Sequence, residues 1–229
     1  MNYCQIRKII NFAKKAMPLI ELGNSDDINL QIWEISETEA FFLAENKGID
    51  ISNLNLYRHP QARLQWLASR MLMFRFLGAE RYANLDKNER GKLFIKDSDL
   101  KISISHSENL VAVAFSNKEF GIDIQKFIDK IPALAAKFIP EELLKNINND
   151  PLFKQISHVH WGIKEALFKA DEHGSLDYRK NLYLHWDNQY SKNGQSFEAS
   201  IKKNDQTSVL KANYREILKD YLFCTVTKS

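Results

Sequence analysis

The sequence predicts an α+β protein made of two closely packed halves that divide near residue 120. Two observations lead to this fold class. Short apolar segments of strand length, separated by turn-like residues, occupy the middle of the chain. Segments with apolar residues at steps of three and four lie on either side of them, as in amphipathic helices. We therefore expect residues 1–120 and 121–229 to form the two halves.

The first half should open with a strand followed by two helices. Residues 29–35 (NLQIWEI) alternate apolar and polar side chains, which favours a half-buried strand. Ser36 can cap the helix that begins within ETEAFFLAENK. Residues 61–77 (QARLQWLASRMLMFRFL) carry apolar residues at helical spacing, and Gly78 is the predicted stop.

Strands are expected in the middle of the chain, after the polar link NLDKNERGK. Their segments are rich in Ile, Val and Phe and are separated by breaks such as HSEN and SNKE. The segments are LFI (93–95), KISIS (101–105), LVAVAFS (110–116) and FGIDIQ (120–125).

Helices should dominate the start of the second half. PALAAKF and PEELLKNI each carry Pro at a first-turn position. A longer helix is expected from about residue 151 to residue 170, ending near DEHGS. Weaker strand signals follow at NLYLHW, SFEASI and DYLFCTVT.

Composition limits the functional classes. The chain has 229 residues, of which 44% are hydrophobic and 27% charged, so it can bury a core. A net charge of +3 is too small to indicate nucleic-acid binding by itself, and an anion site would need locally placed Lys and Arg. A nucleic-acid-binding domain would also need aromatic and basic residues interleaved on one sheet face, and the strands show none.

The compartment is predicted from cysteine usage and hydropathy. Cys4 and Cys224 form no CxxC pair or metal-ligand spacing, which fits a reducing cytoplasm rather than a disulfide framework or a zinc site. No apolar run reaches the roughly 20 residues of a membrane helix, and residues 1–20 lack the apolar region of a signal peptide. We expect a cytoplasmic monomer with no membrane partner.

Polar residues that suit phosphate and metal chemistry follow two of the strands. SISHS places Ser105 and His106 where small donors can meet a phosphate, although taken alone a His in this position more often belongs to a surface turn. In GIDIQ, strand alternation puts Asp123 and Gln125 on one face. Two oxygen-bearing side chains suit a hard cation such as Mg²⁺. The alternative is an edge strand with a polar outer face.

WGIKEALFK (161–169) adds a Glu and a Lys on one helix. Glu165 and Lys169 are four residues apart, the spacing of an ion pair on a helix surface. Taken alone, this spacing indicates an ordinary amphipathic helix with a solvent-exposed salt bridge.

The order SISHS, GIDIQ and WGIKEALFK resembles the signature of the 4′-phosphopantetheinyl transferases of the larger, surfactin-synthetase-activating type. In that family a GID strand supplies an Asp, and a W-x-x-KE-A-x-x-K helix about 40 residues later supplies a Glu and a Lys. Asp123 and Glu165 are 165 − 123 = 42 positions apart. RGKLFI (90–95) and RLQWLASRMLM (63–73) resemble two further family segments. The resemblance covers about residues 58–170.

The resemblance implies a pseudo-dimer of two similar α+β halves with coenzyme A in the cleft between them. It also implies an enzyme that moves 4′-phosphopantetheine from coenzyme A to a serine of an acyl or peptidyl carrier protein, releasing adenosine 3′,5′-bisphosphate. Mg²⁺ is the implied cofactor. Coenzyme A and a carrier protein are the implied partners.

The same resemblance implies roles for individual residues. Glu165 would take the serine proton, and Lys169 would meet the phosphate or the leaving group. Asp123, Glu165 and Lys169 are the implied catalytic residues, Asp123, Gln125 and Glu165 the implied metal ligands. Arg63, Arg90, Lys92, Ser105, His106 and Lys169 are the implied contacts to coenzyme A. Lys164 is expected at most to steer anions.

Two positions depart from the family pattern. Many members have Glu where this chain has Gln125, which offers a carbonyl oxygen without a charge. Gly162 replaces a usual Ser or Thr at a cost in helix propensity of up to about 1 kcal/mol. Gln125 is the one feature that favours a rival interpretation, a non-catalytic module that binds coenzyme A or a carrier protein.

Overall fold

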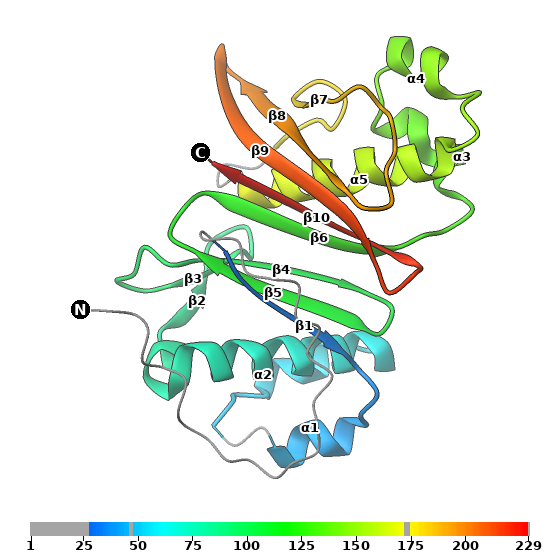
Figure 1. Cartoon of the computed structure of the whole chain (residues 1–229). Helices are drawn as coiled ribbons and strands as arrows, with labels where there is room; N and C mark the ends of the chain where they lie inside the picture. Colours follow the sequence, from blue (N-terminus) through cyan, green and yellow to red (C-terminus); the bar gives the residue numbers. More distant parts are fainter. Residues whose placement is uncertain (1–27, 46–47, 172–174, 229) are drawn as a thin grey trace.

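The computed structural model describes residues 28–45, 48–171 and 175–228 and confirms a mixed helix–sheet protein (Figure 1). Every strand pair in this described part is antiparallel. The predictions for residues 1–27, Cys4 and a signal peptide among them, and for the end of the long helix at 172–174, lie outside the described residues.

The strands belong to two larger sheets and one small hairpin. Within the described residues, the first sheet has the order β1-β5-β4, and the second has the order β6-β10-β9-β8-β7. The bounds are β1 Asn29–Glu34, β4 Lys101–Ser107 and β5 Leu110–Ser116 for the first sheet, and β2 Leu85–Lys87 with β3 Leu93–Ile95 for the hairpin. Those of the second are β6 Phe120–Lys126, β7 Leu182–His185, β8 Gln195–Lys203, β9 Gln206–Ile217 and β10 Tyr221–Lys228.

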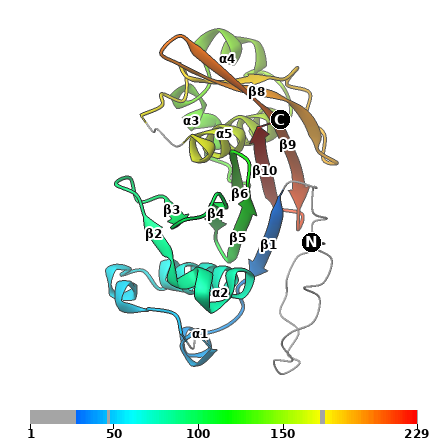
Figure 2. The same ribbon diagram turned by 90° about the vertical axis from the view of Figure 1, so that its left-hand side faces the viewer.

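The helices cover the outer faces of the two larger sheets. Figure 2 shows the order of layers: α2, the sheet with β5, the sheet with β6, and then α5. The long helices are α2 (Pro60–Ala83) and α5 (Phe153–Ala170). The short ones are α1 Glu39–Glu45, η2 Ser52–Leu56, α3 Ile131–Leu134, η3 Ala135–Lys137 and α4 Glu141–Ile147.

Strand β5 contributes to two hydrophobic clusters because its side chains alternate. Val111 and Val113 pack with α2 residues such as Leu72. Ala112 on the opposite face packs with Ile122 of β6. The two sheets therefore share a core, which explains why β5 is apolar on both faces.

Helix α5 lies unusually close to the second sheet. A Cβ built on Gly121 of β6 would fall 1.9 Å from the backbone oxygen of Ala166. A Cβ built on Gly162 would fall 2.4 Å from Nε2 of Gln125 and 2.6 Å from Sγ of Cys224. One glycine from the strand and one from the helix thus allow the close approach, which brings α5 side chains onto the polar face of β6.

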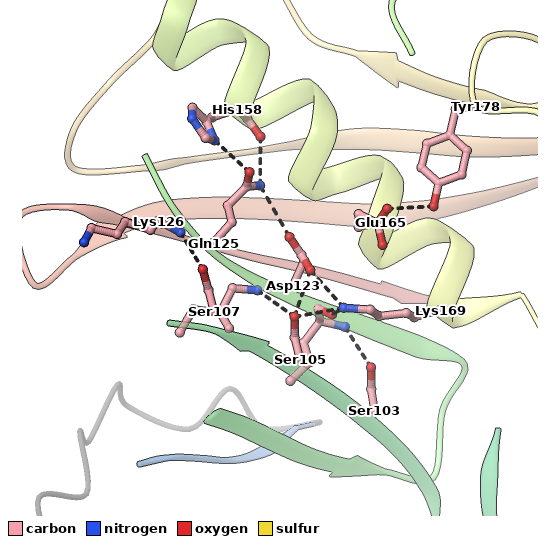
Figure 3. Close-up of polar contacts among 12 residues, drawn as sticks. Ser103, Ser105, Ser107, Asp123, Gln125, Lys126, His158, Glu165, Lys169 and Tyr178 are labelled. Atoms are coloured by element: carbon pink, nitrogen blue, oxygen red, sulfur yellow. Dashed lines mark hydrogen bonds and ion pairs between the residues drawn. The ribbon is translucent and has the colours of Figure 1, made fainter. Parts of the chain in front are cut away.

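The two sheets are also joined edge to edge by serine side chains. The hydroxyl oxygens of Ser103, Ser105 and Ser107 on β4 accept hydrogen bonds from backbone N–H groups of β6 at 3.0–3.1 Å. The donors are Ile122, Ile124 and Lys126 (Figure 3). We call these three side chains the serine row. They provide acceptors for three backbone N–H groups along the edge of β6.

Most predicted elements are found, with three differences. Thr38 rather than Ser36 caps α1, since its hydroxyl accepts from the N–H of Phe41. Gly78 breaks the helix as predicted, with φ 74°, but a further helical segment follows as far as Ala83. Strand β9 and the short β2 were not predicted.

Among the described residues, no helix is both long enough and apolar enough to cross a bilayer.

Candidate active site

Asp123 lies on β6 and faces α5, at the centre of a buried polar cluster (Figure 3). It is only 6% exposed. Its Oδ1 accepts hydrogen bonds from Ser105 Oγ at 2.8 Å and from Lys169 Nζ at 2.9 Å. The predicted pairing of Asp123 and Gln125 on one strand face is confirmed, but α5 covers that face, so it is not a polar outer edge.

Lys169 points back across the helix–strand interface rather than along its own helix. Its Nζ donates to Ser105 Oγ at 2.9 Å, to Ile122 O at 3.1 Å and to Asp123 Oδ1 at 2.9 Å. These three acceptors match the three N–H groups of an ammonium. The four-residue spacing from Glu165 therefore does not mark a surface ion pair between the two residues, because the charge partner of Lys169 is Asp123.

Glu165 is half-buried on α5 and accepts a hydrogen bond from the Tyr178 hydroxyl at 2.9 Å. Burial raises the pKa of its carboxyl, and the nearby charge of Asp123 raises it further. The bond from Tyr178 and the charge of Lys169 oppose that rise. Two carboxylates thus approach each other closely enough to interact, which a cation between them would stabilise.

Gln125 has a buried carboxamide with contacts at both ends. Its Oε1 lies 2.7 Å from Nδ1 of His158, and its Nε2 lies 3.1 Å from the backbone oxygen of His158. Nε2 also lies 3.4 Å from Asp123 Oδ2, at the long end of hydrogen bonding. Burial lowers the pKa of His158 to about 4, so this imidazole is neutral at pH 7.

Lys164 is a buried support of the site and not a surface charge that steers anions. It is 1% exposed, and its Nζ donates to the backbone oxygens of Phe138 at 2.8 Å and of Tyr178 at 2.6 Å. Tyr178 in turn holds Glu165 through its hydroxyl. The expectation of a steering role is therefore wrong, because the amine lies under the site with two carbonyl partners.

The buried Lys164 predicts a pH dependence of stability. Burial lowers its pKa from 10.5 to about 7, so the unfolded chain binds more protons than the folded one between these values. The free energy of unfolding should consequently rise with pH from about 7 to about 10.5, and this contribution should vanish in Lys164→Met. Urea unfolding of both proteins from pH 6 to pH 10 measures the difference. Parallel profiles would contradict a buried amine with a lowered pKa.

A cleft of about 340 Å³ opens beside this cluster. Its lining includes Arg90 and Lys92 from the loop that leads into β3, Ile102 and Ile104 of β4, and Phe168 and Lys169 of α5. Lys92 Nζ donates to the backbone oxygen of Lys169 at 3.0 Å, which ties the loop to the end of α5. Three of the residues predicted to contact coenzyme A therefore meet in one cleft.

The other residues predicted to contact coenzyme A are placed differently. Ser105 is buried inside the serine row, with its hydroxyl bonded to Asp123, Lys169 and the N–H of Ile124. His106 is exposed at the end of β4; desolvation and then the charge of Lys169 lower its pKa.

Arg63 is not brought to the cleft. Its guanidinium forms a bidentate ion pair with Glu39, with N–O distances of 2.5 and 2.8 Å, and it donates to the backbone oxygen of Leu54. These contacts join α1, η2 and α2. A contact with coenzyme A stays a prediction, and it would require Arg63 to leave Glu39.

The chemistry of the donors fits Mg²⁺ held by two carboxylates. In the part of the chain that the structure describes, no group of three or more His, Cys, Asp or Glu side chains is placed to hold a metal. Mg²⁺ is commonly bound through one or two carboxylates with water and substrate phosphate as the other ligands. Asp123 and Glu165, whose charges interact, meet that requirement.

Sequence reasoning missed Tyr178 and His158 as members of the site. Tyr178 lies eight residues beyond α5 in a segment without regular structure, and no motif marks it. His158 stands on α5 seven residues before Glu165, so helical spacing places both on the same face, two turns apart. That spacing could have marked His158, because it places the imidazole on the face of α5 that carries Glu165.

Comparison with known proteins identifies a relative. The chain is 36% identical over 86 residues to a protein of Aneurinibacillus migulanus named 4′-phosphopantetheinyl transferase gsp. Over that segment the chain is similar to a 4′-phosphopantetheinyl transferase. The aligned segment spans 37% of this chain and 36% of that transferase, so the match covers about a third of each protein. No family model matches the chain.

The polar cluster contains residues from two of the motifs on which the predicted resemblance rests. The GID strand and the KE helix, which the sequence places 42 positions apart, meet in the fold at Asp123, Glu165 and Lys169. The resemblance predicted from the motifs is confirmed by this similarity, and Lys169 of the cluster also lines the cleft.

Proposed function

We propose that the protein transfers the 4′-phosphopantetheine group of coenzyme A to a serine of an acyl or peptidyl carrier protein, with Mg²⁺ as cofactor. The observation that supports this proposal is a cluster of two interacting carboxylates and a lysine, of which the lysine also lines a cleft. Asp123 and Glu165 interact electrostatically, and Lys169 bonds to Asp123 and lines the cleft. The relative's name supports the transferase class.

The charges along the cleft support binding of a polyanionic substrate. Lys92 and Arg90 lie on one wall and Lys169 on the other, while Ile102, Ile104 and Phe168 add apolar surface. Basic side chains suit the phosphates of coenzyme A, and apolar surface suits its adenine ring. Desolvation and then the charge of Lys169 lower the pKa of His106, so His106 would add a neutral hydrogen-bond donor.

The proposed reaction requires a neutral hydroxyl to attack a pyrophosphate that already carries negative charge. Mg²⁺ bound by Asp123 and Glu165 would supply positive charge against the pyrophosphate oxygens. Glu165 would accept the serine proton, a role that its raised pKa favours because a stronger base holds the proton better. The Tyr178 hydroxyl fixes the orientation of that carboxylate.

Lys169 would stabilise charge on the phosphate or on the leaving group. All three of its N–H groups have acceptors, so a contact with phosphate replaces one of them. The side chain is 25% exposed, which leaves its ammonium accessible from the cleft. The bonds to Ser105 and Ile122 O would keep it in place during such an exchange.

A single experiment tests the function. The purified protein is incubated with coenzyme A, Mg²⁺ and a panel of apo carrier proteins of fatty-acid, polyketide and peptide-synthetase type. Intact-mass spectrometry should show one phosphopantetheine group added to a serine of at least one carrier, together with release of adenosine 3′,5′-bisphosphate. Binding of coenzyme A without modification of any carrier would support the non-catalytic binding module instead.

His106→Ala should raise KM for coenzyme A and leave kcat nearly unchanged. A phosphate contact that exists before and during the reaction contributes uniform binding. Losing one hydrogen bond to a charged group should raise KM about tenfold. Steady-state kinetics measure this, with His185→Ala as the control, because His185 is exposed on β7 and bonds to Ser200. A collapse of kcat at unchanged KM would show that His106 takes part in the chemistry.

A further inference from the structure

We propose that Gln125 and His158 form a positioning relay that orients Asp123, and that Gln125 is not itself a metal ligand. The relay is the chain of hydrogen bonds from the N–H of Ile128 through His158 and Gln125 to Asp123. This inference deepens the proposed function and rests on it for its catalytic consequence. Its structural part, the direction of the bonds, stands independently.

The direction of the relay follows from its backbone anchors. The N–H of Ile128 donates to Nε2 of His158 at 3.0 Å, so Nε2 carries no proton in the neutral ring. The proton of that ring is then on Nδ1, which donates to Oε1 of Gln125 at 2.7 Å.

The carboxamide is oriented by the same anchors. With Oε1 toward the imidazole, the amide N–H groups of Gln125 face the backbone oxygen of His158 at 3.1 Å and Oδ2 of Asp123 at 3.4 Å. Both of these groups can only accept. Asp123 is consequently held at both oxygens, with Ser105 and Lys169 on Oδ1 and Gln125 on Oδ2.

Turning Gln125 into a ligand would break several of these bonds. Its oxygen would have to face Asp123, and its NH₂ group would then face Nδ1 of His158. Nδ1 would have to give up its proton to Nε2, which would then have to donate to the backbone oxygen of Ile128, at a longer distance of 3.4 Å. The N–H of Ile128 would lose its acceptor, and the backbone oxygen of His158 would lose its donor.

Gly162 makes room for the relay. A Cβ at this position would lie 2.4 Å from Nε2 of Gln125, so any side chain would displace the carboxamide. The helix accepts a glycine in its interior, a residue of low helix propensity, at the point where the amide group passes. The two departures from the family pattern, Gln125 and Gly162, are therefore in contact.

The tautomer of His158 tests the structural part. In ¹⁵N-labelled protein near neutral pH, long-range ¹H–¹⁵N spectra should show the proton on Nδ1, with the signal assigned by its loss in His158→Asn. The Nδ1–H form should persist when coenzyme A and Mg²⁺ are added. A proton on Nε2, before or after the addition, would overturn the relay, because that form is the one that a metal-ligating Gln125 requires.

Kinetics with three variants test the catalytic part. Gln125→Met and His158→Phe should each lower kcat about 10- to 100-fold, as for other residues that orient a ligand, with KM for coenzyme A within about twofold. Because they break one relay, their combined effect should be smaller than the product of the two. His158→Asn keeps an N–H donor for Gln125 and should restore most of kcat. Equal losses in His158→Phe and His158→Asn would contradict the relay.

Gln125→Glu separates the two roles most directly. A carboxylate oxygen in place of Nε2 would face the oxygens of His158 and Asp123, so the relay requires a lower melting temperature without metal and a kcat that stays low even at saturating Mg²⁺. A metal-ligating residue 125 requires kcat at saturating Mg²⁺ to be kept. A wild type that shows the Nδ1–H tautomer but modifies no carrier would contradict the proposed function and still support the relay.

Discussion

Asp123→Asn should reduce transfer about a thousandfold or more at saturating Mg²⁺ and coenzyme A. The substitution keeps the shape of the side chain but removes the charge that faces Lys169 and interacts with Glu165. With one carboxylate left, the proposed metal would lose half of its anionic ligands. Lys169 would lose its charge partner at a position where water is largely excluded. Single-turnover transfer to an apo carrier, followed by mass spectrometry, measures the loss.

Asp129→Asn is the matched control for this prediction. Asp129 has the same side chain, lies six residues further along the chain, and pairs with Lys154 at 2.6 Å with its side chain 96% exposed. Exposed ion pairs contribute little, so transfer by this variant should equal that of the wild type. If Asp123→Asn kept more than about a tenth of wild-type turnover, Asp123 would not be an essential ligand or charge partner.

Gly121→Ala should destabilise the fold by about 3 kcal/mol or more. The added Cβ would lie 1.9 Å from the backbone oxygen of Ala166 and 2.9 Å from the backbone nitrogen of Ala170. Neither atom belongs to a side chain that can rotate away, so α5 as a whole would have to move off β6. Such a shift would also separate Asp123 from Glu165 and Lys169. Urea unfolding monitored by circular dichroism measures the stability.

Gly162→Ala is the comparison for Gly121→Ala, because it adds the same methyl group at the same helix–strand interface. Its Cβ would meet the side-chain atoms of Gln125 and Cys224 rather than backbone. Side chains can adjust, so the loss of stability should be clearly smaller, while displacement of Gln125 should lower kcat. Equal stability of Gly121→Ala and the wild type would show that α5 lies further from β6 than the structure places it.

The sequence predicted the centre of the site because strand and helix periodicity determine it locally. Alternation in GIDIQ placed Asp123 and Gln125 on one face, and the KE motif placed Glu165 and Lys169 one turn apart on a helix. Periodicity could not determine the partner of Lys169, since the spacing to Glu165 fits an ion pair equally well. Lys169 pairs with Asp123 because α5 lies close to β6, and two glycines permit this close approach.

The missed elements have physical reasons as well. Strand β9 alternates Leu210, Ala212 and Tyr214 inward, but long polar side chains between them weakened the apolar signal. The partner of Arg63 was missed because Glu39 lies 24 residues away, on a different helix. An Arg in a motif that resembles a coenzyme-A-binding family is readily assigned to a phosphate. The tertiary structure shows that this guanidinium already pairs with a carboxylate.

The serine row has a consequence for how freely this protein can vary. Ordinary strands are joined by backbone atoms, which every residue possesses, so pairing tolerates almost any sequence. Here the joint consists of hydroxyl groups, and the middle one also serves the site: Ser105 accepts from Ile124 and donates to Asp123. Alanine at this position would remove both the hydrogen bond that joins the two sheets and the hydrogen bond to the Asp123 carboxylate. One oxygen atom thus holds the two sheets together and also orients Asp123, so a substitution of Ser105 changes both contacts.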